Sequence, residues 1–94
     1  MAEARKSVRV RIIGRVQGVS FRVWARDEAQ GLGLAGWVRN EADGSVSALI
    51  IGPEAAVATM LERLHQGPPA ARVSQVVAEN VEAAENINGF RITR

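Results

Sequence analysis

The sequence contains no cysteine, and its 94 residues include only four aromatic side chains, Phe21, Trp24, Trp37 and Phe90. Without cysteine the chain can form no disulfide, thiolate nucleophile or thiolate metal site, which suits a reducing compartment. Single-stranded nucleic acids are usually bound by aromatic rings on the open face of a sheet, and the expected strands supply almost none. The sequence therefore excludes thiol chemistry and argues against nucleic acid as a partner.

Long apolar runs are also missing. No run approaches the length of a membrane span, and the first seven residues lack the apolar core of a signal peptide. Ninety-four residues suffice for one domain with a single core and are too few for two. We therefore expect a cytoplasmic monomer that binds no membrane, with a flexible N-terminal tail over residues 1–6 and a single domain over residues 7–94.

The charged residues give a formal net charge of +2, and the basic residues are all arginine except Lys6. A guanidinium fork suits bidentate phosphate binding, although a bias towards arginine can also be a habit of composition. The one histidine, His65, falls near the end of an expected helix, where a cation suits the helix dipole or simply faces solvent. The acidic residues show no metal-ligand cluster, so we expect no metal ion and no other cofactor.

The spacing of apolar residues predicts alternating strands and helices. A strand starts at Ser7 and carries Val8, Val10 and Ile12 on one face, and a helix follows Ser20, which is a plausible N-cap. The chain then continues with a helix over 21–32, strands over 34–40 and 45–51 around a turn at 41–44, a helix from Pro53 to residue 66, a strand over 72–81 and a short edge strand over 90–93. The pattern leaves open which way the valines of 72–81 face.

This order is that of the ferredoxin-like split βαβ (βαββαβ) fold, an α+β fold with two helices on one face of an antiparallel sheet. A right-handed crossover makes the first and second strands parallel, with one other strand between them. Their carboxyl ends then share one rim of the sheet, at a backbone separation of about 10 Å. Arg22 follows the first of these ends and Asn40 closes the second, so the two side chains can surround one small anion.

The stretch from Gly14 to Arg22 joins the first strand to the first helix. Backbone N–H groups in such a loop, and in the first turn of the helix, can converge on an anion such as phosphate. Arg22 opposes the helix dipole at a cost of roughly 0.3 to 1 kcal/mol, which a bound anion would offset. The alternative is that Gly14 and Gly18 only let the chain turn and that Arg22 faces solvent. No Gly-Lys-Ser/Thr follows, so this is not the loop of nucleotide hydrolases.

Two stretches resemble the signature motifs of acylphosphatases, and the resemblance covers essentially the whole chain. They read Ile12-x-Gly14-x-Val16-Gln17-Gly18-Val19-x-Phe21-Arg22 and Gly36-Trp37-Val38-Arg39-Asn40-x-x-x-Gly44-x-Val46.

The resemblance implies hydrolysis of the carboxyl–phosphate bond of acyl phosphates to a carboxylate and inorganic phosphate. Water would attack directly in line, without metal or covalent intermediate. Arg22 and Asn40 would be the catalytic residues, with Arg22 binding the phosphoryl group and Asn40 orienting the water. The phosphate-binding residues would be Arg15, Val16, Gln17, Gly18, Val19, Ser20, Phe21 and Arg22. Inorganic phosphate would be both product and competitive inhibitor.

Two positions depart from the family pattern. Glu41 follows Asn40 where many relatives have threonine, and its carboxylate would weaken anion binding unless strand alternation turns it away. Arg94 stands last where animal relatives often end in tyrosine, which leaves open any tuning of Arg22 by the chain terminus.

The competing hypotheses are a non-catalytic module that binds RNA or a small ligand on the same fold, and a domain for interactions only. The latter leaves the arrangement of Arg22 and Asn40 unexplained.

Overall fold

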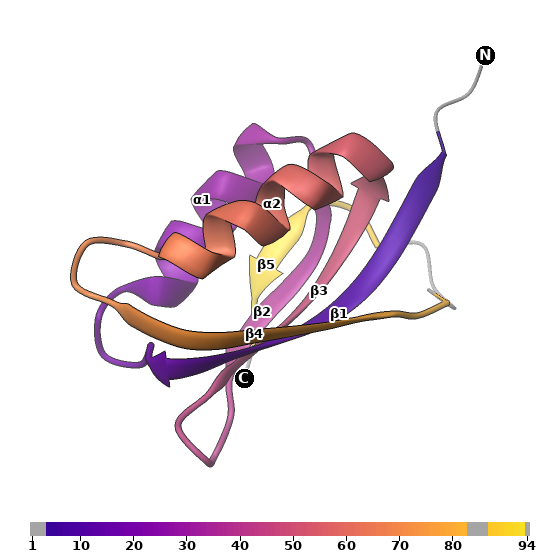
Figure 1. The fold of residues 1–94 in the computed structure, drawn as a ribbon. Helices are drawn as coiled ribbons and strands as arrows, with labels where there is room; N and C mark the ends of the chain where they lie inside the picture. Colours follow the sequence, from indigo (N-terminus) through magenta and orange to yellow (C-terminus); the bar gives the residue numbers. More distant parts are fainter. Residues whose placement is uncertain (1–3, 83–86, 94) are drawn as a thin grey trace.

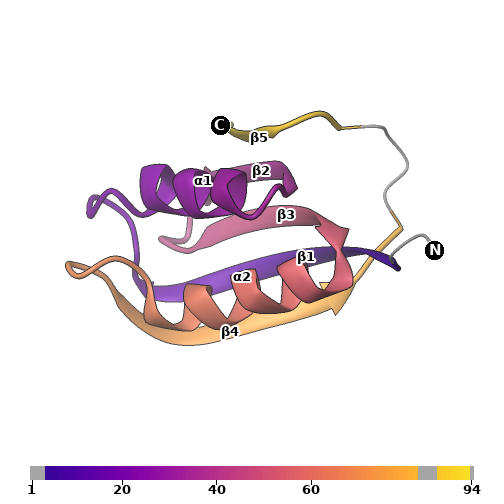
Figure 2. The same cartoon turned by 90° about the horizontal axis from the view of Figure 1, so that it is seen from above.

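The computed structural model describes residues 4–82 and 87–93, which form a five-stranded sheet and two helices (Figure 1). The elements are, in chain order, β1 (Arg5–Arg15), α1 (Phe21–Gly31), β2 (Ala35–Asn40), β3 (Val46–Pro53), α2 (Glu54–Gln66), β4 (Arg72–Asn80) and β5 (Phe90–Ile92). Both helices cover one face of the sheet and leave the other face bare (Figures 1 and 2). The predicted α+β order, βαββαβ, is confirmed.

The strands lie in the order β4-β1-β3-β2-β5. The first four are antiparallel neighbours, so β1 and β2 are parallel with β3 between them, as predicted. The edge strand differs from the prediction of a fully antiparallel sheet, because β5 pairs with β2 in parallel. Since β4 ends at the rim where β1 and β2 begin, β5 starts from that rim and runs the same way. The carboxyl ends of three strands therefore meet at one rim.

The core lies between the sheet and the two helices. Alternation in β1 buries Val8, Val10 and Ile12 under the helices and leaves Arg9 and Arg11 on the bare face. The helices bury side chains at three- and four-residue steps, as predicted: Phe21, Ala25 and Ala29 from α1, and Val57, Met60 and Leu64 from α2.

A bulge in β4 decides which way its valines face. Ile13 pairs with Gln75 and Gly14 with Val73, so Ser74 is an extra residue on β4. The chain bends closely there, because a Cβ on Gly14 would lie 2.1 Å from the backbone oxygen of Arg72. Gly14 is therefore needed for the close approach of β1 and β4 in the sheet. Beyond the bulge one valine packs on the core and the next is 45% exposed on the bare face; these are Val76 and Val77.

Two predicted boundaries need correction. The tail of residues 1–6 is too long, because Arg5 and Lys6 pair with Pro53 and Gly52 in the sheet; residues 1–3 lie outside the described part of the chain. Pro53 is the N-cap of α2 and not its first helical residue, since its ψ of 140° is extended.

None of the helices in the described residues is long and apolar enough to cross a membrane.

Candidate active site

A pocket of about 420 Å³ opens at the rim where β1, β2 and β5 end. Its walls come from the loop after β1, the first turn of α1 and the last residues of β2 and β5. The lining residues are Val16, Gly18, Ser20, Phe21, Arg22, Val23, Asn40 and Ile92. Arg22 and Asn40, eighteen positions apart in the chain, therefore share one pocket, as the parallel arrangement of β1 and β2 predicts.

The loop reaches α1 through two residues with left-handed backbone. Gly18 has φ of 73°, and Ser20, which has a side chain, has φ of 60° and ψ of 26°. Ser20 is the N-cap of α1, as predicted, but in this conformation its hydroxyl makes no cap hydrogen bond. The first turn of α1 also contains no acidic residue. The positive end of the helix, beside Arg22, is thus left for an external acceptor.

Asn40 carries an unsatisfied oxygen. Its Oδ1 is the only buried side-chain nitrogen or oxygen in residues 4–82 and 87–93 that lacks a hydrogen-bond partner. Leaving such an atom unpaired costs roughly 1 to 3 kcal/mol, so folding alone gives no reason for an asparagine here. A hydrogen-bond donor on a bound molecule would supply the missing partner.

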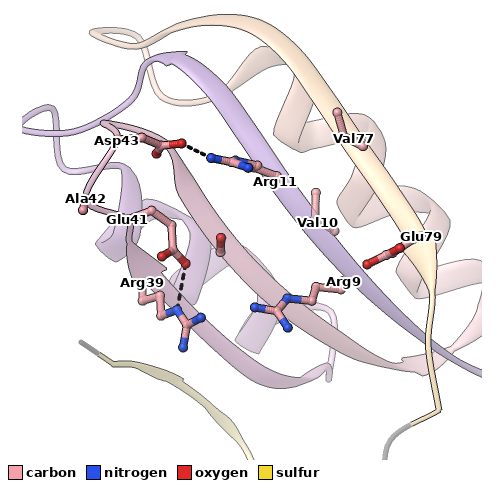
Figure 3. Close-up of a pocket in the computed structure, with 10 residues that line it drawn as sticks. Arg9, Val10, Arg11, Arg39, Glu41, Ala42, Asp43, Val77 and Glu79 are labelled. Atoms are coloured by element: carbon pink, nitrogen blue, oxygen red, sulfur yellow. Dashed lines mark hydrogen bonds and ion pairs between the residues drawn. The ribbon is translucent and has the colours of Figure 1, made fainter.

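Glu41, the next residue, turns to the bare face of the sheet (Figure 3). Its carboxylate accepts a hydrogen bond of 2.8 Å from Arg39 Nε. The hydrogen bond from Arg39 and a second one from Ser47 hold the pKa of the Glu41 carboxyl below its usual value of 4.5. Strand alternation therefore points this carboxylate away from Arg22, and the departure from the family pattern adds no negative charge to the lining of the pocket.

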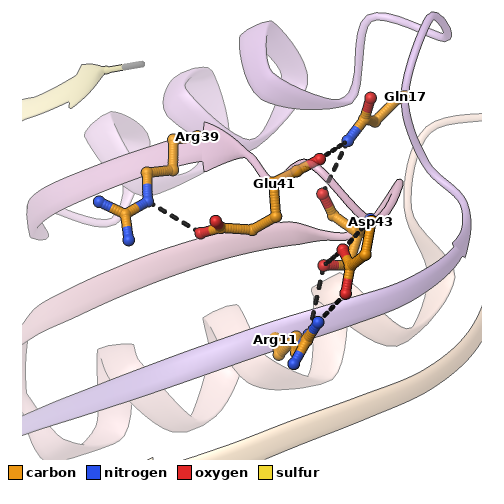
Figure 4. Close-up of polar contacts among 6 residues, drawn as sticks. Arg11, Gln17, Arg39, Glu41 and Asp43 are labelled. Carbon is orange, nitrogen blue, oxygen red and sulfur yellow. Dashed lines mark hydrogen bonds and ion pairs between the residues drawn. The ribbon is translucent and has the colours of Figure 1, made fainter.

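Gln17 joins the loop to the turn that follows β2 (Figure 4). Its side-chain Nε2 donates to the backbone oxygens of Glu41 at 2.8 Å and Ser45 at 2.9 Å. The loop that leads to Arg22 is thereby fixed to the residue after Asn40. This cross-link sets the distance between the two halves of the pocket.

The same turn is held from β1. Arg11 forms an ion pair with Asp43, and its Nε donates to the Ser45 hydroxyl oxygen at 3.2 Å (Figure 4). Asp43 Oδ1 in turn accepts from the Ser45 backbone N–H at 3.0 Å and from its hydroxyl at 2.6 Å. The end of β2 is therefore braced on two sides, which limits how far Asn40 can move.

The family follows from comparison with known proteins. The family model described as acylphosphatase matches residues 8–92. The chain belongs to the acylphosphatase family. It is 57% identical over 94 residues to an acylphosphatase from Rhizobium meliloti (strain 1021), covering 100% of this chain and 99% of that protein. The prediction made from the two motifs is confirmed.

Solved structures of the family have the same fold. A crystal structure of acylphosphatase from Bacillus subtilis matches with a TM-score of 0.91 and 35% identity, over 97% of this chain and 100% of that one. An acylphosphatase structure from Coxiella burnetii gives a TM-score of 0.89 and 36% identity, over 95% and 93% of the two chains. This chain therefore has the ferredoxin-like fold of the acylphosphatases, which are hydrolases.

Only part of the predicted phosphate-binding stretch lines the pocket, namely Val16, Gly18, Ser20, Phe21 and Arg22. The remaining three residues, Arg15, Gln17 and Val19, do not line it. Gln17 uses its side chain on the turn instead, and Val19 packs against the core. Two lining residues were not predicted, namely Val23 and Ile92. Val23 could have been predicted, because it directly follows Arg22 in the chain. Ile92 could not, because its position depends on the pairing of β5 with β2.

Other polar groups of this acylphosphatase-family chain lie away from the pocket. A hollow of about 560 Å³ on the bare face holds three arginines, but Arg11 and Arg39 are paired with Asp43 and Glu41 (Figure 3). His65 is exposed, with Nδ1 2.9 Å from the Leu61 backbone oxygen, as its helix-end position predicts. The described residues contain no group of three or more His, Cys, Asp and Glu that could hold a metal ion. Arg94 lies outside them.

Proposed function

We propose that this protein hydrolyses the carboxyl–phosphate bond of acyl phosphates, giving a carboxylate and inorganic phosphate. The observation that supports this reaction is the pocket that brings together Arg22, Asn40 and the uncapped start of α1. We also propose that the active form is the monomer, in which the residues that line the pocket already lie together.

Arg22 and the loop bind the phosphoryl group. The guanidinium fork donates to two phosphoryl oxygens, and backbone N–H groups between Arg15 and Phe21 donate further hydrogen bonds to the phosphoryl group. The left-handed residues Gly18 and Ser20 give the loop the curvature that such a cradle needs. The strain at Ser20 is of the kind found at binding sites.

Asn40 orients the attacking water. Its unpaired Oδ1 accepts a hydrogen bond from the water, which aims the water oxygen at phosphorus, opposite the leaving carboxylate. The new P–O bond forms as the bond to the acyl oxygen breaks, and the electron pair leaves on the carboxylate. The proton of the water passes to solvent.

Direct attack by water is sufficient for this substrate class. A carboxylate is a good leaving group and needs little protonation, and the metaphosphate-like transition state chiefly needs its oxygens stabilised. Preorganised donors at the loop and Arg22 meet that need without a histidine base, a metal ion or a nucleophilic side chain.

The proposal is tested with benzoyl phosphate, purified protein and a chelator in water enriched in ¹⁸O. We expect steady hydrolysis without a burst of benzoate, and one ¹⁸O atom in the phosphate. Label in the benzoate would mean attack at the carbonyl carbon, and a burst of benzoate would mean a phosphorylated enzyme. Loss of activity with the chelator alone would overturn metal independence.

A further inference from the structure

We propose that the pocket has a second part, formed by Val23 and Ile92, that binds the acyl group and selects acyl phosphates whose acyl group is apolar and uncharged. The inference rests on the proposed hydrolysis and adds the substrate class to it. It assigns a role to two residues that neither bind phosphate nor position the water.

Val23 is an exposed apolar side chain at a place where the fold does not need one. It lies in the first turn of α1 next to Arg22, lines the pocket and is 45% exposed. Among the described residues, the only other large apolar side chain with such exposure is Val77, on the bare face. Because α1 packs on the sheet through the face that carries Phe21, Ala25 and Ala29, Val23 contributes little to the core.

Ile92 reaches the same rim through the parallel edge strand. It pairs with Val38 on β2, and the Thr93 N–H donates to the Val38 backbone oxygen at 2.9 Å. Asn40 lies two residues further along β2, so the end of β5 stands beside the end of β2. Ile92 is half-buried and contributes an apolar wall to the pocket.

Charge completes the argument. Of the described residues that line the pocket, Arg22 alone carries a charge, and its guanidinium is already paired with the phosphoryl group of the substrate. A carboxylate or a second phosphate on the acyl group would therefore find no cation in that lining. It would also lose part of its hydration shell where it contacts Val23 and Ile92, which costs free energy. An alkyl or aryl acyl group instead removes apolar surface from water.

The test compares benzoyl phosphate with 4-carboxybenzoyl phosphate, which differ by one distant carboxylate and keep the same reacting bond. We expect the wild-type protein to favour benzoyl phosphate by about tenfold in kcat/KM, a difference of about 1.4 kcal/mol. Val23→Ala should lower kcat/KM for benzoyl phosphate roughly threefold, because part of the apolar contact is lost. Val23→Lys should bring the preference to about one or reverse it, because the ammonium pairs with the added carboxylate.

Val77 provides the matched control, since it has the same side chain and the same 45% exposure but lies on the bare face of the sheet. Val77→Ala and Val77→Lys should leave the ratio of the two kcat/KM values unchanged. A wild-type ratio near one, or an equal change in the Val23→Lys and Val77→Lys variants, would overturn the acyl subsite. The proposed hydrolysis fails separately, if neither substrate is hydrolysed or if ¹⁸O enters the carboxylate. Melting temperatures of all four variants check that each is folded.

Discussion

The side-chain nitrogen of Gln17 lies 2.8 Å from the backbone oxygen of Glu41, the residue that follows Asn40 in the chain. Its second hydrogen bond, to the Ser45 backbone oxygen, spans the same turn. One side chain thus connects the loop that leads to Arg22 with the strand end that presents Asn40. The geometry of the pocket depends on this cross-link as well as on the two strands.

Replacing Gln17 should loosen the site more than the fold. We expect Gln17→Ala to lower kcat/KM about tenfold, since small displacements of catalytic groups are costly, and to lower stability by about 1 to 2 kcal/mol through the lost hydrogen bonds. Gln30→Ala is the control, because Gln30 donates to the Phe90 backbone oxygen at 3.3 Å, near the other end of α1. Equal losses of activity in the two variants, measured with benzoyl phosphate, would remove the special role of Gln17.

Arg22→Lys should abolish most of the activity although the charge is kept. An ammonium group cannot place two parallel N–H donors on two phosphoryl oxygens, so we expect kcat/KM to fall about 100-fold. Steady-state kinetics with benzoyl phosphate measure the change. A fall of less than about threefold would count against the role of Arg22.

Asn40→Ala should separate catalysis from phosphate binding. Without the oxygen that orients the water we expect kcat to fall about 100-fold, while the inhibition constant of inorganic phosphate stays within about twofold. The variant should also be at least as stable as the wild type, because it removes a buried oxygen that has no partner. Equal weakening of kcat and of phosphate inhibition would reassign Asn40 to the phosphate.

Inorganic phosphate should compete with substrate and raise the melting temperature. At ten times its Kd, a ligand of the folded state adds roughly 1.4 kcal/mol, which in a domain of this size is a rise of about 6 °C or more. Chloride at the same ionic strength should give much less, because it has no tetrahedral oxygens to share among several donors. Arg22→Gln should lose the phosphate-specific rise; if it keeps the full rise, phosphate binds elsewhere.

The pKa of Glu41 predicts a pH dependence of stability. Because hydrogen bonds from Arg39 and Ser47 lower this pKa below 4.5, the charged carboxylate stabilises the folded state above that pH. The contribution is lost as the pH falls through the lowered pKa. Glu41→Gln should therefore be less stable than the wild type at pH 7, and the difference in melting temperature should shrink at pH values below the lowered pKa. A difference that is constant with pH would exclude the ion pair as its cause.

The sequence by itself determined the order of the elements and the two catalytic candidates. Alternation in Val8, Val10 and Ile12 and the helical spacing from Phe21 are local properties, since each depends on residues a few positions apart. The βαββαβ order and the right-handed crossover are together enough to place Arg22 and Asn40 on one rim. The two motifs also predicted the family.

Tertiary structure decided what depends on contacts between distant segments. The bulge at Ser74 fixes the facing of the β4 valines, and it exists because Gly14 allows β4 to approach closely. The parallel pairing of β5 brings Ile92 to the pocket, and Gln17 selects the Glu41 and Ser45 carbonyls as partners. Such choices follow from which backbone groups meet in the folded chain, and no local pattern of residues encodes them.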